Sequence, residues 1–325
     1  MTARQTPVDL SFIIPVRDDA ARLERCLESV ARNRRPGISM EVIVADNGSR
    51  DGSAAIARRF GARVLDGSGC SVAQLRNRAA ALARGDVLAF VDADHEIGSG
   101  WVEAVAQAFL EPGVAAAGAP YSSPPHATWV QRWYGRLREH AAGRHDAEWL
   151  GAGNMAVDRR VFQGLGGFDT SLETCEDVDL CQRIRQAGRR ILSDSRVSTT
   201  HFGDPPTLGA VFFGELWRGR DNLRVTLRGP RTLRHFRSLV IPLVDLAALV
   251  VIVTGAALLT PASVAAMACA AGTVFGLAAM RASVMFRRGP AKPSEAAAAL
   301  MVATAYDAGR ACALIARATH RSRRR

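Results

Sequence analysis

The chain of 325 residues has a formal net charge of +11, and 48% of its residues are hydrophobic. This length suffices for one large α/β domain with additional elements, and the charge indicates an anionic partner such as a nucleic acid, a nucleotide or a membrane surface. The six cysteines are scattered without a CxxC pair or a His/Cys cluster, which argues against a zinc site and a disulfide framework.

Strands and helices alternate through the first hundred residues. Short apolar runs predict four strands, and segments with apolar residues at helical spacing separate them. The predicted strands cover residues 11–16, 41–45, 62–65 and 87–91. This alternation predicts a doubly wound, mostly parallel sheet with the loops after its first, second and fourth strands at one edge. The first ten residues contain no apolar signal segment, so we expect this domain to stay in the cytoplasm.

The fourth predicted strand ends in two carboxylates, Asp92 and Asp94, separated only by Ala93. Ligands bind at the carboxyl ends of strands in such sheets, and two acidic groups this close repel each other unless a cation or a donor lies between them. The pair therefore indicates a site for Mg²⁺ or Mn²⁺ shared with phosphate oxygens. Alternatively, one aspartate caps a turn and the other is solvated.

Further candidate site residues lie between residues 149 and 201. A glycine-rich run around Asn154 permits close approach of backbone to a ligand. Glu176 and Asp177 begin a predicted helix, where acidic side chains also suit the helix dipole. His201 follows a predicted strand in a polar turn.

The last third of the chain is typical of a membrane protein. Residues 239–260 and 262–280 are apolar runs long enough to span a bilayer, and arginines flank their outer ends. They predict a hairpin with both ends inside, although a buried hairpin in a soluble dimer is the alternative. Residues 296–317 suggest an interfacial amphipathic helix followed by a basic tail, or else a third span. Because the arginines accompany these apolar runs, we expect an acidic membrane surface and no nucleic acid as partner.

These features divide the chain into four predicted parts: a catalytic domain over residues 1–207, a basic amphipathic connector over 208–238, a helical membrane hairpin over 239–286, and an amphipathic helix with a basic tail over 287–325.

The ordered motifs resemble the family 2 glycosyltransferases, which are inverting enzymes with a GT-A fold that use nucleotide-sugars. The resemblance covers about residues 10–205, and its strength comes from the order and spacing of motifs that are individually weak. They are Phe12-Ile-Ile-Pro-Val16, Val44-Ala-Asp-Asn-Gly-Ser-Arg-Asp51, Leu75-Arg-Asn77, Asp92-Ala-Asp94, Gly153-Asn-Met-Ala-Val-Asp-Arg-Arg160, Gly166-Gly-Phe-Asp169 and Glu176-Asp-Val-Asp-Leu180.

The resemblance implies a nucleotide-sugar site at the sheet edge. Asp46 would bind the base, and Arg76 would lie near the nucleotide, where a guanidinium suits a diphosphate. The implied nucleotide-sugar-binding residues are Pro15, Val16, Arg17, Asp46, Arg76, Asp92, Ala93 and Asn154.

The resemblance also implies a metal site and a base. Asp94 would bind a divalent metal, which Asp92 and His201 would help to hold, and the metal would neutralise the leaving nucleoside diphosphate. Asp177 matches the general base, and Glu176 would position it or the acceptor. His95 stands where a small or acidic residue is frequent in the family, so the donor-sugar pocket is expected to differ.

The sequence thus predicts a metal-dependent, hexosyltransferase-type enzyme on the cytoplasmic face of a bacterial inner (plasma) membrane. It would transfer sugar from a nucleotide-sugar to a hydroxyl of a lipid-linked or glycan acceptor in polysaccharide or glycolipid synthesis. The alternatives are transfer to polyprenyl phosphate and a non-catalytic nucleotide-sugar-binding membrane protein.

Overall fold

The structure is a computed structural model that describes residues 9–138, 143–229, 233–286 and 292–322. The chain divides into two compact units. The first comprises residues 1–124 and 139–203, and the second comprises residues 125–138 and 204–325.

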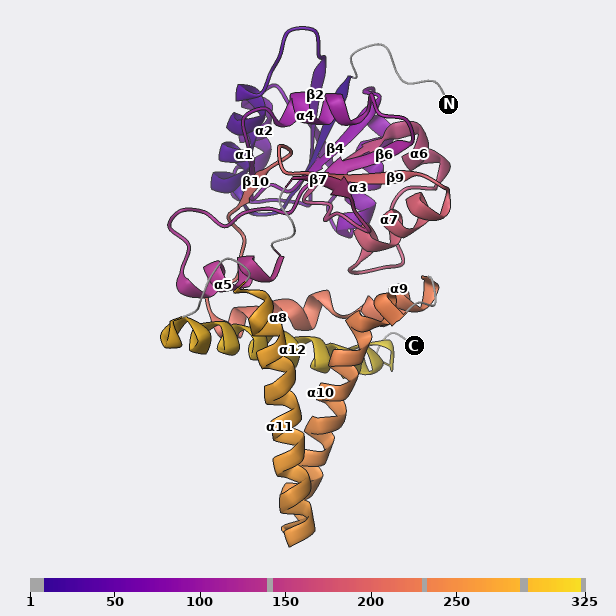
Figure 1. Cartoon of the computed structure of the whole chain (residues 1–325). Coiled ribbons are helices and arrows are strands. Elements are labelled where there is room, and N and C mark those ends of the chain that lie inside the picture. The colour runs from indigo at the N-terminus through magenta and orange to yellow at the C-terminus, as the bar shows by residue number, and fades with distance from the viewer. Residues whose placement is uncertain (1–8, 139–142, 230–232, 287–291, 323–325) are drawn as a thin grey trace. The chain divides into compact units, whose positions relative to one another are not determined.

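The first unit is an α/β domain whose elements alternate as predicted (Figure 1). Its strands are β1 (Leu10–Val16), β2 (Met40–Asp46), β3 (Arg63–Asp66), β4 (Val87–Val91), β5 (His95–Ile97), β6 (Val114–Gly118), β7 (Arg144–Asp146), β8 (Asn154–Asp158), β9 (Arg190–Asp194) and β10 (Thr199–His201). Its helices are α1 (Ala20–Arg32), α2 (Ser53–Arg59), α3 (Val72–Leu82), α4 (Trp101–Ala108), α6 (Arg159–Gly164) and α7 (Glu176–Gln186).

Eight strands form the main sheet in the order β3-β2-β1-β4-β8-β6-β9-β7. The pairs β1–β2, β1–β4, β2–β3 and β6–β9 are parallel, whereas β8 runs antiparallel to both β4 and β6. The sheet is therefore mixed and mostly parallel, as the alternating pattern predicts. The antiparallel insertion of β8 is a feature that alternation alone does not predict.

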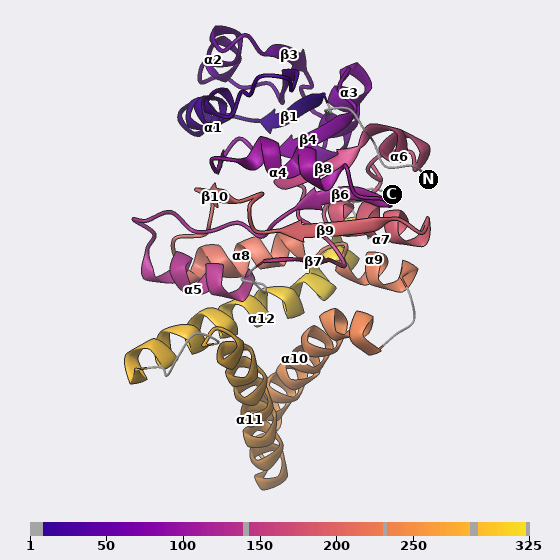
Figure 2. The ribbon, with the colours of Figure 1, turned by 45° about the horizontal axis from the view of Figure 1, so that its top comes forward.

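Both faces of this sheet are buried, which explains the continuous apolar strands. Side chains of β1 alternate, so that Phe12 and Ile14 pack with α1, α2 and α4 on one face and Ile13 packs with α3, α6 and α7 on the other. Figure 2 shows α1 and α2 on the side of the sheet opposite to α3. This double layer holds the loops at the carboxyl ends of β1, β2 and β4 at a common edge.

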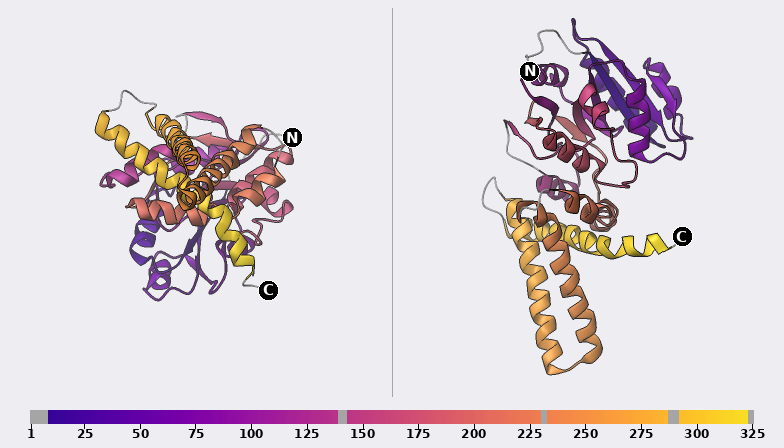
Figure 3. Two further views of the ribbon diagram at one scale, coloured as in Figure 1. Left: turned by 90° about the horizontal axis from the view of Figure 1, so that it is seen from below. Right: turned by 90° about the vertical axis from the view of Figure 1, so that its right-hand side faces the viewer.

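The second unit is helical. It contains α5 (Trp129–Arg138), α8 (Leu208–Arg218), α9 (Asn222–Arg228), α10 (Leu233–Leu258), α11 (Pro261–Val284) and α12 (Pro293–Ser322). Helices α10 and α11 form an antiparallel pair, and α12 crosses them instead of running alongside (Figure 3).

Candidate functional site

A cluster of one carboxylate and two imidazoles lies just beyond the end of β4. Asp94 follows that strand by three residues, and His95 begins β5. Strand β5 pairs in antiparallel fashion with β10, and this register places His201 directly opposite His95. A backbone hydrogen bond of 2.9 Å from the Phe202 N–H to the Asp94 carbonyl closes the loop. The cluster therefore comes from two short strands about one hundred residues apart.

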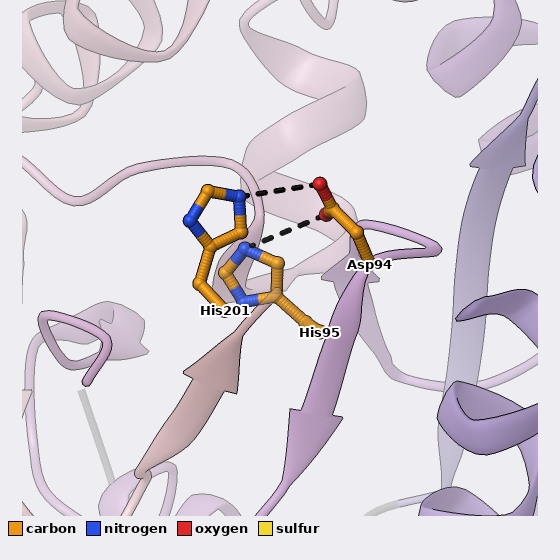
Figure 4. Close-up of side chains that lie close together, drawn as sticks. All are labelled: Asp94, His95 and His201. Atoms are coloured by element: carbon orange, nitrogen blue, oxygen red, sulfur yellow. Dashed lines mark ion pairs between the residues drawn. The ribbon is translucent and has the colours of Figure 1, made fainter. Parts of the chain in front are cut away.

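The three side chains converge on a common point (Figure 4). Asp94 Oδ2 lies 3.2 Å from His201 Nε2, and Asp94 Oδ1 lies 3.9 Å from His95 Nε2. One ligand atom from each residue can be chosen so that all lie within 4.8 Å of one another. Both imidazoles are buried, with exposed fractions of 2% for His95 and 7% for His201.

Surrounding groups orient the two imidazole rings. The Nδ1 atom of His95 is 3.1 Å from the Thr199 hydroxyl oxygen, which leaves Nε2 to face Asp94. The ring of Tyr121 lies edge-on to both imidazoles, with centroids 4.9 Å from His95 and 4.7 Å from His201. The rings are thus oriented by contacts that lie outside the cluster itself.

The cluster fits a divalent cation. Burial alone would raise the pKa of Asp94, but the hydrogen bond and charge of His201 and the charge of His95 hold it well below its usual range. A Cβ on Gly203 would lie 1.9 Å from Asp94 Oδ2 and 2.8 Å from His201 Nε2, so only glycine leaves this side of the cluster open. Two imidazole nitrogens and one carboxylate are a donor set typical of transition metals.

A buried arginine organises the carboxylates beside this cluster. Arg76 of α3 is 3% exposed, and its Nη2 donates to Asp92 Oδ1 at 2.6 Å while its Nη1 donates to Glu176 Oε1 at 2.7 Å. Burial alone would lower the pKa of this guanidinium, but the two carboxylates outweigh that effect and raise it. The ion pairs therefore hold Asp92 and Glu176 on either side of one fixed cation.

Glu176 and Asp177 begin α7 as adjacent acids. Burial and the charge of Asp177 raise the pKa of Glu176 to about 7, against the opposing effect of Arg76. Burial also raises the pKa of Asp177, although its carboxylate accepts hydrogen bonds from the backbone N–H groups of Val178 at 2.8 Å and Ala152 at 3.2 Å. The Asp177 carboxylate is thus held in place by backbone donors and binds a proton more readily than an exposed aspartate, and its role as a general base stays a prediction.

Contacts of two glycines show that the candidate metal cluster (Asp94, His95 and His201) and the carboxylates of Asp92 and Asp177 belong to one site. A Cβ on Gly153 would lie 2.8 Å from Asp92 Oδ2 and 3.0 Å from His95 Nε2. A Cβ on Gly151 would lie 3.9 Å from both Asp177 Oδ2 and the Tyr121 ring. The glycine-rich loop before β8 therefore separates the two groups by little more than its own backbone.

The predicted nucleotide residues lie at the ends of β1 and β2. Pro15 and Val16 pair in parallel with Ala45 and Asp46. Asp46 is 8% exposed, and its Oδ1 accepts the Ser49 N–H at 2.9 Å. The side chain of Arg17 is 71% exposed at the same edge. These residues adjoin one another, and their contact with a nucleotide stays a prediction.

Asn154 and Ala93 are both buried among protein groups. Asn154 is 1% exposed, and its amide donates to the carbonyls of Ala119 and Val197 while its Oδ1 accepts from Trp101 Nε1. Its polar atoms therefore tie the start of β8 to the segments after β6 and before β10 and to α4. Ala93 is 5% exposed and packs with the core. Direct contact of either residue with nucleotide-sugar also stays a prediction.

The structure thus brings Asp92, Asp94, Glu176, Asp177 and His201 into one region, together with Arg76. It places His95 beside Asp94 and His201 as a further candidate metal ligand. Asp92 Oδ1 pairs with Arg76, and a role of Asp92 as a metal ligand stays a prediction. The signal for His95 was present in the sequence, because it directly follows Asp94 and imidazole is a common metal ligand.

The second unit contains the predicted membrane segments. Among the residues that the structure describes, three helical segments are by length and composition apolar enough to cross a membrane: Ser238–Leu258, Pro261–Val284 and Pro293–Ala316. The first two are the predicted hairpin. The predicted flanking side chains of Arg231, Arg234, Arg237, Arg287 and Arg288, and the basic tail from Arg317 onward, lie outside the described side chains.

Comparisons with known proteins agree with this geometry. Residues 11–163 match the family described as glycosyl transferase family 2. The chain is 26% identical over 243 residues to glycosyltransferase AglE of Haloferax volcanii, covering 70% of this chain and 77% of that protein. It is 27% identical over 319 residues to succinoglycan biosynthesis protein ExoA of Rhizobium meliloti, covering 92% of each.

A solved structure has the same fold. It is the mannosyltransferase PcManGT from Pyrobaculum calidifontis in complex with GDP-Man and Mn²⁺, which matches with a TM-score of 0.60 at 18% identity. The match covers 98% of this chain and 89% of that chain. The predicted resemblance to family 2 and the predicted GT-A fold with apolar C-terminal helices are both confirmed.

Proposed function

We propose that this chain, a glycosyltransferase with a family 2 domain, is a metal-dependent inverting enzyme that acts at a membrane. It would move a sugar from a nucleotide-sugar to a hydroxyl of a lipid-linked glycan acceptor. The observation that carries this proposal is that Asp94, His95 and His201 converge in the region that also contains Asp177, to which Gly151 and the ring of Tyr121 connect them.

Asp94, His95 and His201 would hold the metal. A divalent cation there supplies Lewis acidity that neutralises charge on the leaving nucleoside diphosphate. The two imidazoles favour Mn²⁺ over Mg²⁺, because Mg²⁺ prefers oxygen ligands alone. Asp92 would support this metal site indirectly. Its Oδ1 is held by the ion pair with Arg76, and this keeps its Oδ2 near His95.

The remaining residues bind the donor and move one proton. Asp46 and the edge from Pro15 to Arg17 would hold the base, and Arg76 would fix the carboxylates between donor and acceptor. Asp177 would accept the proton of the acceptor hydroxyl as that oxygen attacks C1 of the sugar from the face opposite the leaving group. One glycosidic bond forms as the bond to the diphosphate breaks, and the anomeric configuration inverts.

The acceptor is inferred from the second unit and from the relatives. ExoA is named for succinoglycan biosynthesis, which supports a polysaccharide-building role. The apolar helices support a membrane location, which we place on the cytoplasmic face of the inner membrane. Transfer to polyprenyl phosphate is less well supported, because a phosphate acceptor needs no base such as Asp177. The named glycosyltransferase relatives favour turnover over a non-catalytic role.

The test is transfer by an Asp177→Asn variant. Nucleotide-sugars would first be screened for Mn²⁺-dependent hydrolysis or transfer to membrane lipid extracts. We expect D177N to lose transfer while its melting temperature is unchanged, and we expect the matched control D179N, which alters an acid two residues on that pairs with Arg183, to retain it. Full activity of D177N would overturn the assigned base. Transfer to polyprenyl phosphate alone would identify the other acceptor class.

A further inference from the structure

The ring of Tyr121 adjoins both the candidate metal cluster and the carboxylate of Asp177. It is in edge contact with the two imidazoles of the cluster, with ring centroids 4.9 Å from His95 and 4.7 Å from His201. Its Cε1 atom is 3.9 Å from the position that a Cβ on Gly151 would take, and Asp177 Oδ2 is 3.9 Å from the same position. A single aromatic side chain therefore borders both groups on which the proposed reaction depends.

Hydrogen bonds on both sides of Tyr121 in the chain fix its position. Before it, the carbonyl of Ala119 accepts from the side-chain amide of Asn154 at 2.9 Å. After it, the N–H of Ser122 donates to the carbonyl of the first residue of β10, and the Ser122 carbonyl accepts from the His201 N–H, each at 2.9 Å. Because the backbone is held at both of these points, the ring is placed beside the imidazoles before any ligand binds.

The proposed reaction takes place in the space between the cluster and Asp177. In an inverting transfer, the acceptor oxygen attacks C1 of the sugar from the face opposite the leaving oxygen. The leaving diphosphate would be held by the metal at Asp94, and the acceptor hydroxyl would be held by Asp177. The transferred sugar must therefore lie between the two groups, and a side chain that adjoins both of them borders the sugar.

Tyr121 has the exposure and the chemistry that this position requires. It is only partly buried, whereas His95 and His201 are buried, so a ligand can still contact the Tyr121 side chain. The face of an aromatic ring is negative, and the C–H groups on one face of a pyranose are apolar and weakly positive. An aromatic ring therefore packs against a sugar without the cost of burying a charged group.

We infer that the ring of Tyr121 contacts the sugar that is transferred and helps to select it. This inference rests on the proposed function, because it requires that a metal at Asp94 holds the diphosphate of the donor. It adds a sugar contact that neither the metal cluster nor Asp177 supplies. The contact contributes to the affinity for a nucleotide-sugar and not to the affinity for the corresponding nucleoside diphosphate, which lacks the sugar.

Paired ligands test this contact in the full chain, purified in detergent. Titration calorimetry at saturating Mn²⁺ gives the Kd of GDP and GDP-mannose, and of UDP, UDP-glucose and UDP-N-acetylglucosamine. The ratio of the nucleotide-sugar Kd to the nucleoside diphosphate Kd reports on the sugar, because the metal and the nucleotide base act on both ligands. The variants are Y121L, which removes the ring, Y121F, which keeps it, and Y306L, a matched tyrosine replacement in the second unit.

We expect Y121L to raise this Kd ratio about three- to tenfold, the size of one aromatic contact, and we expect Y121F and Y306L to keep the wild-type ratio. An unchanged ratio in Y121L would overturn the inference alone, and weaker Mn²⁺ binding with that unchanged ratio would leave the ring only the task of positioning the imidazoles. A rise in Y121F as large as in Y121L would overturn the ring contact in favour of the hydroxyl. Wild-type protein that binds none of the three nucleotide-sugars would overturn the proposed donor site and this inference with it.

Discussion

At the scale of single residues, Arg76 decides how the acidic site is held together. Its guanidinium is buried between Asp92 and Glu176, and the ring of Phe168 lies 5.7 Å from it. Without this cation, two carboxylates of one site would face each other and Asp177 across a poorly solvated space. Arg76 is therefore a structural requirement of the site, whatever contact it makes with a nucleotide.

Replacing Arg76 by methionine should destabilise the protein strongly. The change leaves the buried Glu176 carboxylate without its partner, which typically costs about 3 kcal/mol. Differential scanning fluorimetry in detergent should show a lower melting temperature. The double variant R76M/E176Q should recover part of the loss, because its second change removes the orphaned charge. An R76M protein as stable as wild type would contradict the account.

The raised pKa of Glu176 predicts a pH-dependent stability. A carboxyl group whose pKa is higher in the folded than in the unfolded state stabilises the fold at low pH and loses that contribution as pH rises. With a folded pKa of about 7, the loss should extend from about pH 4.5 to slightly above pH 7. The melting temperature of wild type relative to E176Q should fall across this window. A constant difference would contradict the assignment.

At the scale of elements, the pairing of the short strands β5 and β10 brings together the candidate metal cluster of Asp94, His95 and His201. The sequence predicted the strand that ends before Asp92 because its five residues form a continuous apolar run. The structure shows all five of them buried. The sequence did not predict β5 or its pairing, because a three-residue strand carries no periodic signal and its partner lies far along the chain. His95 was therefore not among the predicted metal ligands.

Gly203, which follows β10, should be as important for metal binding as the candidate ligands themselves. A G203A variant places its Cβ where Asp94 Oδ2 and His201 Nε2 now lie, so both side chains must move apart. We expect Mn²⁺ affinity to fall about tenfold or more, as measured by titration calorimetry, with little change in melting temperature. The control G209A meets no atom within 4 Å and should bind Mn²⁺ like wild type.

The loop before β8 shows a second limit of sequence reasoning. Its glycines predicted close approach of the backbone to a ligand, and the structure shows that a Cβ on Gly153 would crowd the candidate site residues Asp92 and His95. The contact of Asn154 with the nucleotide-sugar stays a prediction. What the sequence did not predict is that its amide donates to two carbonyls from distant segments, because such long-range partners are invisible in a single sequence.

At the scale of the whole molecule, the sequence anticipated an α/β catalytic part and an apolar C-terminal part because each has a distinct pattern. Alternation of strand and helix is periodic, and the apolar runs are long. The orientation of α12 was harder to predict. It is apolar enough to count as a third span, yet it crosses the hairpin, and its Asp307 accepts from Arg281 Nε at 2.6 Å.

The proposed topology predicts where the hairpin turn lies. An A262C variant places a thiol next to Pro261 at the start of α11, and a membrane-impermeant maleimide should label it in intact bacterial cells. Cys70 in the first unit should react only after lysis. Labelling of Cys70 in intact cells would place the first unit outside the cytoplasm and would contradict the proposed topology.

The most direct test of the central claim is donor binding with and without metal. Titration calorimetry of the purified full chain with GDP- and UDP-sugars, in the presence of Mn²⁺ or of a chelator, measures whether the metal and the donor occupy one site. We predict binding of at least one donor with Mn²⁺, loss of that binding in chelator, and the same loss in D94A with Mn²⁺ present. Equally tight binding without metal, or unchanged binding by D94A, would contradict the proposed site.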